Sequence, residues 1–580
     1  MAWLQALMML AVATLGLAHA AGGARELSYR FRFHPQQSRI DVELRFQGDS
    51  DGRTVISVPQ RWAGADDLDR GIERLQVVGT EAALLPSSHS DERVLRHPPN
   101  APITLRYSLR QINSGPLHAQ HFYSPLLLAD YFHFVGHAGL VLPDWSGSHP
   151  IDVSLDWQGI GGETVANSFG VGSASQRVRV RLAELAHAVY LGGAVRLLRR
   201  EVGGRPVFVA LRDRWDFSDE TFADEVSDII AVERDFWRDH DFPHYLVSAL
   251  PLDSPGTTIG FGLTNAFTVA LSRQFSPAQA EGWRQVQQLL AHEHQHNWTP
   301  GRLGVKPARE LRFYWFTEGF TDYYTWLLLL RAGKVDLEAY VAEVNRNLRT
   351  YYGSAALYAD NDQVEREFFT DYSVQRLPYR RGELLAQRWN AEIRAASKGQ
   401  QSLDDVMHAL LATRGDGRRE LSPILVANFL RRAGVANPSA DINRHIELGE
   451  PVLPRGDELG PCVRVEWVPR VRYSLGFDLE ATKANQRMTG VVADGPAGRA
   501  GVREGEPLLD GSFGVSDPEW EVHLQLLRNG GSEEVSYLPQ IEEAEQMAQY
   551  RVDGEALARS PDSCYAWFGA RPPQPGGTER

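Results

Sequence analysis

Residues 289–298, Leu-Leu-Ala-His-Glu-His-Gln-His-Asn-Trp, define the centre of this chain. Within them, His292 and His296 stand four residues apart, and Glu293 directly follows the first histidine. On a helix, this spacing puts both imidazoles on one face, one turn apart, where they can share a tetrahedral metal ion. Glu293 then stands beside the metal, placed to take a proton from water. The pattern predicts a metal site with a carboxylate base.

The helix that carries this motif is predicted to span 277–298. It opens with Ser276-Pro277, an N-cap residue followed by a proline at the first helical position. Leu289-Leu290 directly precede the motif, so the metal face would lie against an apolar core that excludes water. The alternative is a surface helix with scattered polar residues, because such a pentapeptide arises by chance in about 3–4% of chains this long.

A second predicted helix, over 317–332, supplies a third ligand. Glu318 would complete the set formed by His292 and His296 and leave a fourth position open for water, as catalytic zinc requires. Asp322, one turn later, would accept the outer ring N–H of a ligating histidine. One Zn²⁺ ion is therefore the predicted cofactor, although two imidazoles and a carboxylate also bind other divalent ions.

The chain resembles the glycyl aminopeptidase family of gluzincin zinc metallopeptidases in His292-Glu293-x-x-His296, Asn297-Trp298 and Glu318-Gly-Phe-Thr-Asp322-Tyr-Tyr. The resemblance in architecture extends over nearly the whole mature chain. It implies a multidomain α+β protein with a β-rich N-terminal domain, a thermolysin-like, mostly helical catalytic domain and a C-terminal, β-rich PDZ-like domain. It also implies hydrolysis of peptide bonds in peptides or proteins by metal-activated water, with Glu293 as the general base.

A further family element is Tyr379, within Pro378-Tyr379-Arg380-Arg381-Gly382. This segment resembles the Tyr-x-x-Gly segment whose hydroxyl steadies the oxyanion in related aminopeptidases. A comparable oxyanion donor contributes about 2.7–4 kcal/mol to transition-state stabilisation. The alternative for Tyr379 is a tyrosine at the start of a helix that only packs on the domain.

The segment upstream of the metal helix departs from the family pattern. Relatives carry a Gly-Gly-x-Glu-His-like segment whose glutamate captures the substrate's free amino group. Here Gly262, Leu263 and Thr264 are the corresponding substrate-binding positions, and Thr264 takes the acidic one. A hydroxyl can hydrogen-bond an ammonium group but cannot neutralise it in a desolvated pocket. We therefore predict aminopeptidase-like activity with altered amine recognition. The alternatives are an endopeptidase of the same fold, or a non-catalytic periplasmic binding or quality-control protein with a PDZ-like module.

Hydrophobic periodicity divides the chain into domains. From about residue 25 to 200, apolar residues alternate with polar ones, which indicates antiparallel strands with one buried face. After Gly203-Gly204, long helical stretches follow at 218–239, 277–298, 317–332 and 380–396. The predicted domains are a β-rich domain at 21–203, a zinc peptidase domain at 204–455, a PDZ-like domain at 456–545 and a C-terminal tail at 546–580.

The predicted PDZ-like domain has a candidate carboxylate-binding loop, formed by Ser474, Leu475, Gly476 and Phe477. Such a loop presents backbone N–H groups to a peptide C-terminus while an edge strand pairs with the peptide. A hairpin expected around Asn529-Gly530-Gly531 leaves little chain for the helix that normally walls the groove. Binding of a C-terminal peptide and a purely structural cap both remain open.

Residues 1–20 hold an apolar run that ends in Ala18-His19-Ala20, the small-x-small pattern of a signal-peptidase site. Cleavage after Ala20 predicts a periplasmic or secreted protein without a stable membrane span, because the run is short for a bilayer. In an oxidising compartment, the isolated pair Cys462 and Cys564 suggests a disulfide. The alternative is two unrelated thiols.

Composition and charge limit the other functions. The chain of 580 residues carries a formal net charge of -14, so it lacks the electrostatic footprint of a nucleic-acid-binding protein. Four further histidines, His118, His121, His133 and His137, lie close together in sequence. No carboxylates accompany them, so packed or surface histidines are favoured over a second metal site.

Overall fold

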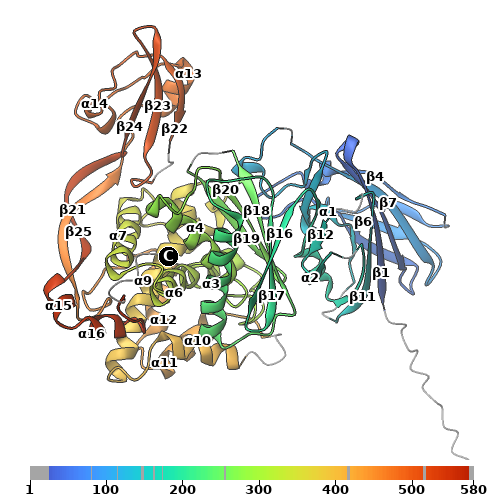
Figure 1. The fold of residues 1–580 in the computed structure, drawn as a ribbon, viewed down its shortest axis with the longest axis horizontal. Helices are drawn as coiled ribbons and strands as arrows, with labels where there is room; N and C mark the ends of the chain where they lie inside the picture. Colours follow the sequence, from blue (N-terminus) through green and yellow to red (C-terminus); the bar gives the residue numbers. More distant parts are fainter. Residues whose placement is uncertain are drawn as a thin grey trace, which may run out of the picture.

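The computed structural model describes residues 25–573, except 80, 114, 146–148, 161–163, 173, 254–255, 414–418 and 514–516. The predicted signal peptide at 1–20 and the end of the predicted tail, 574–580, lie outside the described residues. Figure 1 shows a β-rich N-terminal region, a central region of one sheet and many helices, and a small module that stands out from the helices. The predicted β-rich and helical regions are therefore both present.

Three sheets form the N-terminal region. The largest has the strand order β14 (Ser175–Val180), β11 (Ile151–Gln158), β1 (Glu26–His34), β2 (Arg39–Gln47), β7 (Pro102–Arg110) and β4 (Ile72–Val77). In β1 the predicted alternation is confirmed, because Leu27, Tyr29 and Phe31 are completely buried while Arg30 and Arg32 lie on the exposed face. Short segments between these strands are η1 (Pro35–Gln37), η2 (Leu68–Gly71), η3 (Ala119–His121), α1 (Gly136–Gly139) and α2 (Leu182–Ala186).

The other two sheets complete the N-terminal core. One has the order β10 (Leu142–Pro143), β3 (Arg53–Ser57), β6 (Glu92–Arg96) and β5 (Ala83–Pro86). The other has the order β13 (Gly170–Val171), β12 (Thr164–Asn167), β15 (Val189–Gly193), β9 (Tyr131–Val135) and β8 (Leu126–Leu127). This last sheet faces the central region, because Tyr131 and Leu191 share a buried cluster with Leu246 and Phe261.

The central sheet has the order β16 (Arg196–Val202), β17 (Arg205–Leu211), β18 (Tyr245–Leu252), β20 (Ala266–Ser272) and β19 (Thr258–Leu263). Strands β17, β18 and β20 are parallel, and β19 is an antiparallel edge strand. The sequence places β16 in the N-terminal domain. In the structure it pairs with β17 across Gly203-Gly204, whose positive φ angles suit a tight hairpin turn. The central sheet therefore begins before the predicted boundary.

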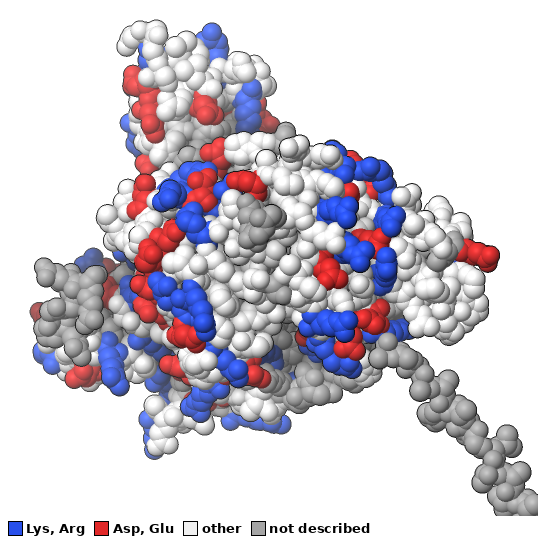
Figure 2. Space-filling view, turned by 45° about the vertical axis from the view of Figure 1, so that its right-hand side comes forward, with Lys and Arg blue, Asp and Glu red and all other residues white. Residues whose placement is uncertain are grey.

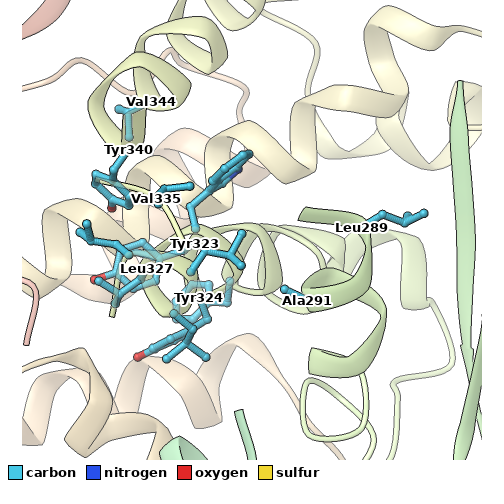
Figure 3. Close-up of a cluster of buried hydrophobic side chains, with 14 of the residues drawn as sticks. Leu289, Ala291, Tyr323, Tyr324, Leu327, Val335, Tyr340 and Val344 are labelled. Carbon is cyan, nitrogen blue, oxygen red and sulfur yellow. The ribbon is translucent and has the colours of Figure 1, made fainter. Parts of the chain in front are cut away.

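The helices of the central region pack beside this sheet (Figure 1). They are α3 (Asp219–Trp237), α4 (Ala280–Gln295), η4 (Glu310–Phe313), α5 (Tyr314–Thr317), α6 (Gly319–Arg331), α7 (Leu337–Gly353), α8 (Asn361–Glu367), α9 (Tyr372–Ala396), α10 (Leu403–Ala412), α11 (Pro423–Arg432), α12 (Pro438–Asp441) and η5 (Ile442–Glu447). Figure 3 shows side chains of α6 and α7 in one apolar cluster beside α4. This cluster belongs to the largest hydrophobic core of the described residues, which holds α4 and α6 in place.

The start of α4 differs from the prediction. The sequence suggests an N-cap at Ser276, but the helix begins at Ala280, with Gln279 at its N-cap. Residues 276–279 instead form a turn, in which the Gln279 N–H donates to the Ser276 carbonyl. The other end of the helix reaches the histidine motif, as predicted.

The C-terminal module is inserted into a long two-stranded ladder. Strands β21 (Val463–Tyr473) and β25 (Gln540–Val552) pair antiparallel and pack on α7. Between them lie α13 (Leu479–Asn485), α14 (Pro496–Arg499) and a sheet of β22 (Leu508–Ser512), β23 (Val522–Arg528) and β24 (Gly531–Tyr537). The predicted hairpin at Asn529-Gly530-Gly531 joins β23 to β24.

The segment predicted as a C-terminal tail is ordered in its first part. Residues up to 552 complete β25, and α15 (Gly554–Arg559) and α16 (Pro561–Ala566) follow. A disulfide joins Cys462 to Cys564, with their Cα atoms 5.4 Å apart. The pairing suggested by the sequence is confirmed, and it ties α16 to the start of the ladder. Among the described residues, no helix is long and apolar enough to cross a membrane.

Candidate metal centre and active site

The predicted ligands converge where α4 ends and α6 begins. His292 lies in the last turn of α4, His296 directly follows that helix, and Glu318 precedes the first residue of α6. Each offers one ligand atom, and these three atoms lie within 4.8 Å of one another. All three side chains are buried or nearly so, which shields the cluster from bulk water.

The spacing of the ligand atoms fits a tetrahedral zinc ion. The two Nε2 atoms of His292 and His296 are 3.2 Å apart, and they lie 3.5 and 3.4 Å from Oε2 of Glu318. Zinc bonds of 2.0–2.2 Å separate neighbouring ligands of a tetrahedron by about 3.3–3.6 Å. Three protein ligands of this kind match a catalytic rather than a purely structural zinc site, because a structural site uses four.

Hydrogen bonds at the outer ring nitrogens fix the orientation of both imidazoles. Nδ1 of His292 lies 2.9 Å from Oδ1 of Asp322, as predicted, and Nδ1 of His296 lies 2.9 Å from the Thr299 carbonyl. A ring that donates from Nδ1 leaves its Nε2 lone pair for a metal. Arg380 contacts the other carboxylate oxygen of Asp322 at 3.3 Å. This second contact holds the carboxylate in place.

The neighbouring histidines favour a negative charge on Glu318 and Asp322. Burial opposes ionisation of Glu318, but the neighbouring histidines outweigh it and hold the pKa of Glu318 well below its usual range. Burial likewise opposes protonation of His292, yet hydrogen bonds to Asp322 and Glu318 raise the pKa of His292 well above its ordinary value. These buried carboxylates therefore favour a positive charge beside them, which either protons on the histidines or a metal ion can supply.

Glu293 lies against the edge strand of the central sheet. A Cβ atom placed on Gly260 would come within 2.7–2.9 Å of the Glu293 side chain, and one on Gly262 within 3.1 Å of His296. The two glycines thus let β19 pass closely over the motif. Burial is the main cause that raises the pKa of Glu293, and the charge of Glu318 adds to it. A base with a raised pKa is better suited to accept a proton near neutral pH.

A close helix crossing brings Tyr379 to the ligands. A Cβ on Gly382 would come within 1.8 Å of the Trp315 carbonyl, and one on Gly319 within 2.5 Å of the Gly382 Cα. Only glycines allow α9 to approach α5 and α6 this closely. Gly319 follows Glu318, and Gly382 lies one turn after Tyr379, so the crossing sets both functional side chains side by side.

Tyr379 faces the metal cluster as a protonated phenol. The centre of its ring lies 6.3 Å from that of the His292 ring, and the two rings are nearly parallel. The guanidinium carbon of Arg376 lies 4.9 Å from the centre of the Tyr379 ring. Burial, followed by the charge of Glu318, raises the pKa of Tyr379 well above its ordinary value. A phenol that keeps its proton can donate a hydrogen bond to a developing oxyanion.

The predicted substrate-binding positions lie at the end of β19. Gly262 lies over His296, and Leu263 is buried in the cluster between the two regions. The hydroxyl of Thr264 donates to the carbonyl of Glu184, and its N–H donates to the carbonyl of His187. The Thr264 side chain is therefore engaged by the N-terminal region.

Two aromatic residues near the site are not predicted by the sequence pattern. Tyr123, from the N-terminal region, is half-buried, and desolvation together with the charges of Glu293 and Glu318 raises its pKa. The pKa of Tyr314, at the start of α5, is likewise raised, first by burial and then by the charge of Glu318. Tyr314 belongs to the aromatic stretch before Glu318, which is a usable signal. Tyr123 follows two histidines of the 118–137 cluster, but nothing local ties it to the metal helix.

The histidines of that cluster serve packing where the structure describes their contacts. His133 is buried and lies 3.3 Å from the Ser248 hydroxyl and 3.2 Å from that of Thr268. His137 stacks on Trp62 with ring centres 5.5 Å apart.

The predicted carboxylate-binding loop differs from a peptide-binding edge. Leu475 and Phe477 are buried in the core of the module, and Gly476 has φ +79° and packs against Pro496. The chain continues from this loop into α13, at the position where a strand would pair with a peptide. A helix forms there because Asp478 caps it, accepting from the Ala481 N–H.

Comparison with known proteins identifies the class. Residues 285–364, which include His292, Glu293, His296 and Glu318, match the family model described as M61 glycyl aminopeptidase. The matched segment therefore contains the whole ligand set and the candidate base. The chain is a peptide hydrolase of the metallopeptidase class.

Solved structures with a similar fold exist. An aminopeptidase N family protein from Idiomarina loihiensis aligns with a TM-score of 0.68 at 16% identity, covering 93% of this chain and 100% of that one. An M1 zinc metallopeptidase from Deinococcus radiodurans aligns with a TM-score of 0.48 at 15% identity, covering 74% and 96%. The first of these likenesses establishes a shared fold. No curated protein sequence matches this chain.

Proposed function

We propose that the protein is a zinc-dependent peptidase that acts on the ends of peptides or proteins, with amine recognition altered from that of an ordinary aminopeptidase. The observation that supports it best is the triangle of His292, His296 and Glu318 ligand atoms with zinc spacing, beside the buried carboxylate of Glu293. A bound zinc ion would supply Lewis-acid activation of a carbonyl and of water.

The residues of the chain perform the remaining steps of hydrolysis. The carboxylate of Glu293 accepts a proton from the attacking water and then delivers it to the nitrogen of the leaving amine. The phenol of Tyr379 donates a hydrogen bond to the carbonyl oxygen as negative charge develops on it. Asp322 and the Thr299 carbonyl keep both imidazoles in their ligating orientation throughout.

The engaged hydroxyl of Thr264 supports altered amine recognition. It cannot offer a full negative charge to an ammonium group, and it already donates to the Glu184 carbonyl. We expect the enzyme to cleave a peptide and its N-acetylated twin with kcat/KM values within about tenfold, since one lost charged contact costs about 1.5–3 kcal/mol where it exists. A preference of a thousandfold for the free amine would contradict this expectation. Efficient internal cleavage of both would favour an endopeptidase.

We also propose export with cleavage after Ala20, which places the enzyme in the periplasm or outside the cell. The Cys462–Cys564 disulfide supports this, because disulfides persist in oxidising compartments. N-terminal sequencing of the protein recovered from its native cell tests the site: a chain that begins at Ala21 supports it, and a retained Met1 contradicts it.

For the C-terminal module, we propose a structural cap. Glu519 pairs with Arg349 of α7 through both carboxylate oxygens at 2.8 Å, so the module is fixed to the catalytic region. Calorimetric titration with peptides that end in a free carboxylate distinguishes a structural cap from a peptide-binding module. No heat of binding is expected, whereas saturable binding would indicate a peptide-binding PDZ-like module.

A further inference from the structure

A hollow of about 460 Å³ lies on the outer face of the six-stranded N-terminal sheet. Its charged lining residues are Arg30, Arg32, Asp41, Glu43, Arg74 and Arg106. We propose that this hollow is a binding site for ligands that carry phosphate-type oxyanion groups. The site lies on a different sheet from the metal centre, and it is independent of the proposed peptidase function.

The two carboxylates that line the hollow are already engaged by neighbouring cations. Glu43 forms ion pairs with Arg30, Arg45 and Arg106, at 3.3, 2.6 and 2.7 Å. The pairs follow from the strand register, in which Arg30, Glu43 and Arg106 stand opposite one another on β1, β2 and β7. Three arginines therefore share the carboxylate of Glu43.

Asp41 on β2 and Arg32 on β1 lie beside this group on the same face of the sheet. Asp41 pairs with Arg39 and His34 at 2.9 Å each. Arg32, beside it on β1, hydrogen-bonds the neutral side chain of Gln158 at 3.0 Å. Among the charged residues that line the hollow, four arginines stand against two carboxylates, in a chain whose formal net charge is -14. The surplus is therefore local and opposite in sign to the whole protein.

A β-bulge adds a cation to the hollow. The pairing of β4 with β7 shifts register between Glu73 and Gln76, and Arg74 inside the bulge has a φ of +56°. Few residues other than glycine adopt this left-handed backbone, and bulges re-aim side chains. Here the bulge brings the Arg74 guanidinium to 3.1 Å from the Ser108 hydroxyl on β7, a neutral partner.

The chemistry of these groups selects the ligand. A guanidinium presents its N–H donors in a planar fork that matches the oxygens of a phosphate group, and such charge-assisted pairs are strong. Several forks over one hollow suit a ligand with two or more phosphate groups. Figure 2, in which the right-hand side of Figure 1 comes forward, shows basic side chains with acidic ones among them on this side of the molecule. Free phosphate chains and phospholipid headgroups share the required chemistry.

Binding of two phosphate sources to the full-length protein tests the proposal. Calorimetry with tripolyphosphate addresses a free ligand, and co-sedimentation with phosphatidylglycerol vesicles, beside phosphatidylcholine vesicles, addresses a membrane headgroup. We expect saturable binding in at least one arm, weakened at least about tenfold when NaCl rises from about 50 to about 300 mM. The arm that binds identifies the source.

Variants assign the binding to the hollow. Arg32→Gln with Arg74→Gln should weaken binding at least about tenfold, whereas Arg179→Gln, on β14 of the same sheet and paired with Asp152, should not. If the bulge variant fails to fold, Arg32→Gln alone, on a regular strand, gives the same comparison. Absence of saturable binding in both arms, or equal binding by wild type and the Arg32 variants, would overturn the proposal.

Discussion

At the residue scale, the position of the base depends on the absence of a side chain at Gly260. A Cβ there would lie 2.7–2.9 Å from Glu293, so Gly260→Ala should push the carboxylate aside. We expect a loss of about 10²-fold in kcat with zinc content unchanged, because small misplacements of a reacting group have effects of this size. Peptide hydrolysis with metal analysis measures both. Gly554→Ala, where a Cβ meets nothing within 4 Å, is the control; equal activity of both variants would contradict the account.

A second residue-scale prediction concerns metal affinity. Asp322→Asn keeps a hydrogen-bond acceptor for His292 but removes the negative charge and the ion pair with Arg380. Zinc affinity should fall about 10–100-fold, the usual cost of losing such an outer partner. Competition with a chromophoric chelator measures it. The control is Asp228→Asn, an exposed carboxylate paired with Lys334. Unchanged affinity in Asp322→Asn would show that this contact does not orient the ligand.

The sequence predicts the ligand residues because their relation is local. His292 and His296 are one helical turn apart, and Glu318 and Asp322 repeat that spacing on the next helix, so periodicity alone places each pair on one face. Tyr123 reaches the site from a turn of the N-terminal region, between η3 and β8. Its position depends on how the N-terminal region packs against β19, and no local pattern contains that information.

At the element scale, the ladder of β21 and β25 joins the module to the catalytic region. Its two strands are separated by the whole module, so their pairing depends on a contact between distant segments. This is why the sequence places part of β25 in a tail. At the loop around Ser474, by contrast, the local pattern is misleading. It resembles a carboxylate-binding loop, but Asp478 caps a helix directly after it.

The disulfide gives an element-scale prediction. Cys462 and Cys564 close a loop of 102 residues around the module, and Tyr565 accepts from the Leu337 N–H on α7. Replacing both cysteines with serine should lower the free energy of unfolding by about 2–5 kcal/mol. Without the bond the long loop is no longer closed, so the unfolded chain gains conformational entropy. Urea denaturation of the two proteins measures the difference. An unchanged midpoint would mean that the packing of α15 and α16 suffices without the bond.

At the scale of the whole molecule, His133 joins the N-terminal region to the central sheet. It lies on β9 and is buried against the hydroxyls of Ser248 and Thr268. Burial lowers the pKa of His133 to about 3. Between its unfolded pKa, near 6.5, and about 3, the unfolded chain binds the extra proton, so stability falls as pH falls. The loss should reach about 3 kcal/mol near pH 4.

Comparison with His133→Gln isolates this contribution. The variant starts from a lower stability at pH 7 but lacks the titrating group, so its urea midpoint should change less between about pH 7 and about pH 4. Both proteins are measured with the same metal content, so that acid release of metal affects them equally. If the urea midpoints of the two proteins changed equally with pH, protonation of His133 would not account for the loss of stability in acid.

The most direct test of the central claim is peptide hydrolysis by the zinc-loaded protein and its Glu293→Gln variant. A mixed peptide library, with cleavage mapped by mass spectrometry, shows both whether bonds are cut and where. We expect cleavage by the wild type and a loss of about 10²–10⁴-fold in the variant, with equal zinc content, because the variant lacks only the base. A folded, zinc-loaded wild type that cleaves nothing, or a variant that cleaves equally well, would contradict it.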